Sequence, residues 1–140
     1  MTASGTSIAA LQGALAAEHA AVYGYGVVGA VLAGTEQADA RADWTAHQLA
    51  RDALIIMLNK LGATPVAASP AYKLPFPVTS PKSAARLAAT LEKGVTRAYL
   101  GLVAVNNPTL RTYGAQAMQT SANRALAWSG TTTAFPGMPT

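Results

Sequence analysis

The chain has 140 residues, a formal net charge of +4 and no cysteine. Hydrophobic residues make up 51 % of it and charged residues 11 %, so it has enough apolar surface to bury, and disorder is excluded as its main state. The absence of cysteine excludes a disulfide framework, a thiolate zinc site and a cysteine nucleophile. We therefore expect one domain over residues 1–140, with one core.

The composition predicts an all-α protein, because 32 residues are alanine, the best helix former, and alternating runs of β-branched and aromatic residues are missing. The first helix is expected over about 7–33, where apolar residues recur at three- and four-residue spacing. Thr6 or Ser7 can cap its start, and Gly34 can end it. Its glycines at 24, 26 and 29 would be tolerated where a neighbouring helix approaches closely.

The second helix is expected over about 37–61, with Gly62 as its C-terminal cap. The third is expected over about 81–105, because Ser80 can cap it and Pro81 suits the first helical position. The fourth, over about 108–129, follows the break at Asn106-Asn107-Pro108.

The connection over residues 62–80 contains four prolines and cannot be helical. Its nineteen residues can span up to ~60 Å, whereas a helix of 25 residues is ~37 Å long. We therefore expect it to run the length of the bundle as a strap, with Tyr72, Leu74, Phe76 and Val78 alternating toward the helices. Two helical hairpins joined by one long crossover between helices 2 and 3 define a ferritin-like four-helix bundle.

Three ionisable residues lie on otherwise apolar helix faces: Glu18, His47 and Glu92. A di-metal carboxylate centre needs one Glu from each of two helices and a Glu-x-x-His pair from each of the other two. Residues 108–129 contain no Asp, Glu or His, and Trp44 stands three residues before His47. We therefore expect no metal or other cofactor. If a metal site with fewer ligands exists, its candidate residues are Glu18, His47 and Glu92.

The favoured interpretation is a buried polar cluster of Glu18, His47, Arg51 and Glu92, with Arg51 as the first expected partner of Glu18. Buried charges persist when they are paired and hydrogen-bonded. In this interpretation the cluster stabilises the core and has no catalytic role.

Several segments resemble a bacterial ferritin-like family catalogued as a domain of unknown function. The most specific are Glu18 to Gly26 (EHAAVYGYG) and Ala71 to Val78 (AYKLPFPV). The others are 47–52 (HQLARD), 91–103 (LEKGVTRAYLGLV) and the closing Phe135-Pro136-Gly137. The resemblance implies a four-helix ferritin-like bundle and no established activity, substrate or cofactor.

We expect a binding or self-associating module, and not an enzyme, that forms a homodimer, because few charges cover its surface. The second hypothesis is a metal-binding or oxidoreductase protein with a reduced ferritin-like site. The ten basic residues are spread almost evenly along the sequence, so we expect no nucleic-acid partner. The uncharged run over 20–34 is shorter than the ~20 residues that cross a bilayer, so we expect no membrane partner and a cytoplasmic location.

Overall fold

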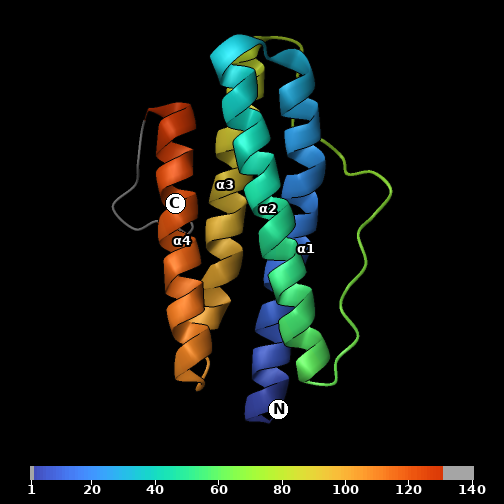
Figure 1. The fold of residues 1–140 in the computed structure, drawn as a ribbon, viewed down its shortest axis with the longest axis vertical. Helices are drawn as coiled ribbons and strands as arrows, with labels where there is room; N and C mark the ends of the chain where they lie inside the picture. The colour runs from blue at the N-terminus through green and yellow to red at the C-terminus, as the bar shows by residue number, and fades with distance from the viewer. Residues whose placement is uncertain (1, 131–140) are drawn as a thin grey trace.

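The computed structural model describes residues 2–130, which form four helices and no strand. The helices are α1 (Ala3–Val31), α2 (Gly34–Lys60), α3 (Pro81–Val103) and α4 (Pro108–Ser129). Figure 1 shows them lying side by side as a bundle. Residue 1 and residues 131–140, which include the Phe135-Pro136-Gly137 segment, lie outside the described residues.

Local sequence explains the helix ends, although α1 begins and ends before the expected 7–33. The Thr2 side chain accepts a hydrogen bond from the Gly5 backbone N–H, so it caps α1 in place of Thr6 or Ser7. Gly34 begins α2 instead of ending α1, because its φ of +60° allows a connection of only Leu32 and Ala33. At α3, the side chains of Ser80 and Ser83 bond reciprocally to each other's backbone N–H as a capping box.

The helices pack as two antiparallel pairs. The extensive contacts are those of α1 with α2, α1 with α3, and α3 with α4, whereas a groove separates α2 from α4. In Figure 1 the connection after α2 leaves one end of the bundle and reaches the other end, where α3 begins. Tyr72, Leu74, Phe76 and Val78 are half-buried along it, and the residues between them are exposed. Gln12 fastens the connection to α1 through hydrogen bonds with Thr64 and Val66.

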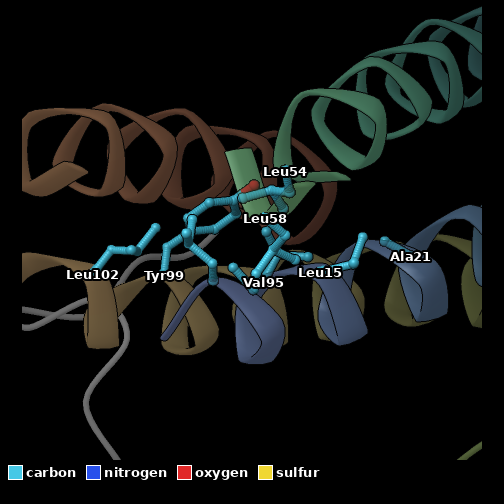
Figure 2. Packing of buried hydrophobic residues seen from close by; sticks show 9 residues of the cluster. Leu15, Ala21, Leu54, Leu58, Val95, Tyr99 and Leu102 are labelled. Atoms are coloured by element: carbon cyan, nitrogen blue, oxygen red, sulfur yellow. The ribbon is translucent and has the colours of Figure 1, made fainter. Parts of the chain in front are cut away.

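The core consists of two apolar clusters. One contains Leu11, Leu15, Leu54, Leu58 and Tyr99. Figure 2 shows Leu15, Leu54, Leu58 and Tyr99 of this cluster converging from α1, α2 and α3. The other packs around Tyr25, Val28 and Leu87, with Leu74, Phe76 and Val78 of the connection against it. The ionisable side chains Glu18, His47 and Glu92 are buried on the same three helices.

Only one of the three glycines at 24, 26 and 29 of α1 marks a close helix contact. A Cβ at Gly24 would lie 2.5 Å from Leu91 of α3, whereas Gly26 and Gly29 have nothing within 4 Å of that position. Helices α3 and α4 approach each other closely at Gly114, where a Cβ would lie 2.7 Å from the Leu102 Cβ. Among residues 2–130, no helix is long and apolar enough to cross a membrane.

Candidate functional site: a buried carboxylate–imidazole network

His47 of α2 lies between two glutamates of different helices. Its Nδ1 is 2.5 Å from Oε2 of Glu18 on α1, and its Nε2 is 2.8 Å from Oε2 of Glu92 on α3. All three side chains are at most 2 % exposed. Since each ring nitrogen faces a carboxylate oxygen, the arrangement suits a protonated imidazole, which donates from both nitrogens.

The charge on His47 follows from these contacts. Burial alone lowers the pKa of His47, but its hydrogen bonds to Glu18 and Glu92 and the charges of the two carboxylates outweigh burial and raise that pKa to about 9. A protonated His47 then contributes one positive charge against two carboxylates. This pairing explains how glutamates can occupy the interior of an apolar bundle.

Two tyrosines complete the network. The Tyr25 hydroxyl donates to Glu92 Oε2 at 2.5 Å, and the Tyr99 hydroxyl donates to Glu18 Oε1 at 2.8 Å. Burial raises the pKa of both tyrosines, and the charges of Glu92 and Glu18, respectively, raise it further. Each tyrosine is therefore held protonated as a hydrogen-bond donor to its glutamate.

The two tyrosines share one sequence signal that could have identified them. Each stands seven residues after a glutamate of its own helix: Tyr25 after Glu18, and Tyr99 after Glu92. Seven residues are two helical turns, so each glutamate and tyrosine share a face. Because α1 and α3 are antiparallel, the tyrosine of each helix lies opposite the glutamate of the other. Neither tyrosine is among the four residues that were expected in the polar cluster.

Asp43 connects this network to the groove between α2 and α4. Its Oδ2 accepts a hydrogen bond from Trp128 Nε1 at 2.8 Å and lies 3.4 Å from the Tyr25 hydroxyl. Its Oδ1 lies 3.5 Å from Arg124 Nε. Burial raises the pKa of Asp43, and the hydrogen bond from Trp128 offsets part of that effect.

The groove itself has a volume of about 750 Å³. Its α2 wall carries three carboxylates, and its α4 wall carries one arginine and one tryptophan. The residues with ionisable or aromatic side chains that line it are Glu36, Asp39, Asp43, Arg124 and Trp128. The groove is therefore a polar, open feature beside the buried network.

Arg51 is not part of the network. Its side chain is 28 % exposed, and its Nε bonds to Oδ1 of Asp52 at 2.9 Å. Glu18 is paired with His47 instead of with Arg51, which lies about one turn further along α2 and bonds to Asp52. The structure thus brings together Glu18, His47 and Glu92 of the four residues expected in the polar cluster, and adds Tyr25 and Tyr99.

The same residues are poorly suited to a metal centre. His47 has no free ring nitrogen in this arrangement, because both face carboxylates. Helix α4 contributes no carboxylate or imidazole. Among residues 2–130, no group of three or more His, Asp or Glu side chains is arranged to hold a metal ion.

Comparison with known proteins places this chain in a family whose function is not assigned. Residues 10–140 match the family described as "Domain of unknown function (DUF4439)", and the chain belongs to that family. One similar solved structure is that of a conserved hypothetical protein, rv2844, from Mycobacterium tuberculosis. It is 34 % identical, with a TM-score of 0.86, over 90 % of this chain and 96 % of that chain. No curated protein matches this chain in sequence.

Proposed function

We propose that this protein is a ferritin-like bundle that works without a metal ion, as a binding or self-associating module and not as an enzyme. The observation that supports this proposal best is the position of His47, whose two ring nitrogens both face glutamates. The imidazolium supplies the positive charge that a metal ion would supply in a carboxylate centre.

The first prediction concerns Glu18. Replacing Glu18 by Gln removes one partner of a buried ion pair, which costs about 3–5 kcal/mol of stability. We expect Glu18→Gln to lower the melting temperature of metal-free protein, whereas Glu36→Gln, an exposed glutamate of α2, leaves it nearly unchanged. Added iron, manganese or zinc should not change the wild-type midpoint, measured by differential scanning calorimetry.

A second candidate function is metal binding at Glu18, His47 and Glu92, a site with fewer ligands than a ferritin-like di-metal centre. One observation favours it: Glu92 Oε1 is buried and has no hydrogen-bond partner among the described residues. A cation could use that oxygen. The calorimetry distinguishes the two functions, because a metal that binds the folded protein raises the midpoint temperature of unfolding. A rise with wild-type protein that Glu18→Gln abolishes would establish the metal site and reject the metal-free proposal.

Self-association is supported by an apolar groove of about 460 Å³ along α3 and α4. Val103 and Leu126 in this groove are 37 % and 41 % exposed. Its apolar lining residues are Leu100, Val103, Ala115, Met118, Ala122 and Leu126. We propose that a second copy of the chain covers this groove in a two-fold homodimer, because a two-fold axis brings the same apolar patch of both copies together and removes it from water.

A further inference from the structure

Helix α3 collects four basic side chains that are separated in the sequence. Lys82, Arg86, Lys93 and Arg97 follow one another at intervals of four, seven and four residues. At 3.6 residues per turn, these intervals place all four within about 60° of the helix circumference. All four are exposed. They form a basic stripe about 22 Å long, since fifteen residues separate the first from the last.

Acidic side chains do not neutralise this basic stripe. None of its four residues forms an ion pair with any residue from 2 to 130. Every acidic residue of the chain that is not buried lies on α2. Helix α2 contacts α1 but has no extensive contact with α3. The stripe is therefore a positive surface on the side of the bundle away from the acidic helix.

The side chains around the basic stripe indicate what it can bind. The exposed residues Thr90, Gly94 and Gly101 lie beside it, and they are small. A protein partner would need aromatic or large apolar anchors at the centre of the contact, and an interfacial helix would need an apolar face toward the lipid. Along the stripe, the apolar face of α3 is buried in the core, and the exposed apolar residue Val103 lies beyond Arg97, in the groove with α4. Single-stranded nucleic acid is bound through stacking on open aromatic side chains. The aromatic ring that contacts the stripe, Phe76, is half-buried and lies beneath the Arg86 guanidinium, whose Cζ is 4.0 Å from the ring centroid.

We infer that the basic stripe binds the phosphate backbone of double-stranded DNA without sequence preference. Lys and Arg side chains contact phosphates, and small residues allow the backbone to approach closely. A length of about 22 Å corresponds to about six base pairs at 3.4 Å each. This inference goes beyond the proposed function and replaces the expectation of no nucleic-acid partner. That expectation considered only the spacing of basic residues along the sequence, whereas the helix gathers four of the ten on one exposed face.

The salt dependence of binding tests the inference. Four phosphate contacts predict a slope of log Kobs against log[salt] of about −3.6, so that affinity falls about 150-fold between 50 and 200 mM KCl. The measurement is fluorescence anisotropy with the full chain and a fluorescein-labelled 24-base-pair duplex of mixed sequence. A second duplex of scrambled sequence should bind equally, and a single strand of the same length more weakly.

Two double variants with matched charge identify the surface. Lys93→Gln/Arg97→Gln removes two charges of the basic stripe and should change the slope to about −1.8. The affinity of this variant for the duplex should then fall only about 12-fold between 50 and 200 mM KCl. Lys60→Gln/Arg41→Gln removes one lysine and one arginine from α2 and should leave the slope near −3.6. All four positions are exposed, so the circular dichroism melting curves should match the wild type.

Three results would overturn the inference. The first is no binding to the duplex at 25 mM KCl. The second is an equal loss of binding in both double variants, which would mean that total charge, not the basic stripe, attracts DNA. The third is binding to vesicles of phosphatidylglycerol and phosphatidylcholine that requires Lys93 and Arg97 while the duplex does not bind. That result would assign the stripe to an anionic membrane surface.

Discussion

The imidazole of His47 is the contact point of three helices. Through Glu18 it connects α2 to α1, and through Glu92 it connects α2 to α3. Helices α2 and α3 share no extensive packing of their own, so the His47–Glu92 contact is a direct connection between them. Loss of the proton from this one side chain would remove a hydrogen-bond donor from the network.

The second prediction follows from the pKa of His47, which is about 9 in the folded protein against an ordinary value of 6.5. The folded state therefore binds more protons than the unfolded state between these values. The stabilisation is fully present below pH 6.5 and is lost as the pH rises through about 9. We expect the free energy of unfolding to fall by about 3 kcal/mol over this window, at 1.36 kcal/mol per pKa unit.

Urea denaturation at pH values from 6 to 9.5 measures this loss. An NMR titration of the histidine ring protons checks its cause, with an expected midpoint near 9 for His47. Both tyrosines of the network have raised pKa values, so their ionisation does not contribute within this window. A His47 midpoint below 6.5, or a stability that stays constant up to pH 9, would contradict a charged imidazole at this position.

At the scale of the helices, the contact of α3 with α4 depends on the absence of a side chain at Gly114. A Cβ there would lie 2.7 Å from the Leu102 Cβ and 3.3 Å from the Tyr99 carbonyl oxygen. Neither atom is the end of a flexible side chain. The situation at Gly24 differs, because the nearest atoms there are the terminal methyl groups of Leu91, which can move.

The third prediction is that Gly114→Ala destabilises the protein by about 1–3 kcal/mol, because the added methyl overpacks the α3–α4 contact. Gly13→Ala is the matched control. Its Cβ would meet nothing within 4 Å, so the better helix propensity of alanine should stabilise the protein by up to about 1 kcal/mol. Chemical denaturation measures both. Equal effects of the two substitutions on stability would show that the effect of Gly114→Ala comes from helix propensity and not from packing.

The number and approximate position of the helices could be predicted because the signals are local. Ser80, Pro81 and Asn107 mark helix starts in the sequence, and α4 has the expected bounds. The start of α1 was missed because a second capping residue, Thr2, precedes the expected Thr6 and Ser7. Capping chemistry identifies possible starts but does not choose among consecutive ones.

The candidate site could be predicted only in part. Glu18, His47 and Glu92 are recognisable because they lie on otherwise apolar faces. The choice of His47 over Arg51 as the partner of Glu18 depends on how α2 is rotated and shifted against α1. Four residues separate these two side chains, about one turn, so both were plausible partners. The pattern of one sequence does not determine that relative placement.

At the scale of the whole molecule, the exposed acidic residues lie on a different helix from the basic stripe and the apolar groove. The exposed acidic residues are on α2, the basic stripe is on α3, and the apolar groove lies between α3 and α4. Helix α4 carries no acidic residue. A second copy that covers the apolar groove would therefore meet little like-charge repulsion from carboxylates.

The fourth prediction concerns this proposed homodimer. We expect the wild-type chain to elute as a dimer in size-exclusion chromatography with light scattering. Leu126→Glu places a charge in the apolar groove and should give a monomer, because burying an unpaired charge is costly. Leu49→Glu is the control, since Leu49 on α2 is 66 % exposed and lies outside the groove. A wild-type chain that is monomeric at high concentration would contradict the dimer.

The crossed arrangement of Glu18 with Tyr99 and Glu92 with Tyr25 also limits how α1 can slide along α3. A slip of one turn, about 5.4 Å, would separate both tyrosines from their acceptors at once and leave four polar groups unpaired in an apolar interior. Leucine and alanine faces alone would tolerate such a slip, because one turn of small apolar residues resembles the next. The network therefore selects a single alignment of the two helices, as a buried asparagine does in a coiled coil.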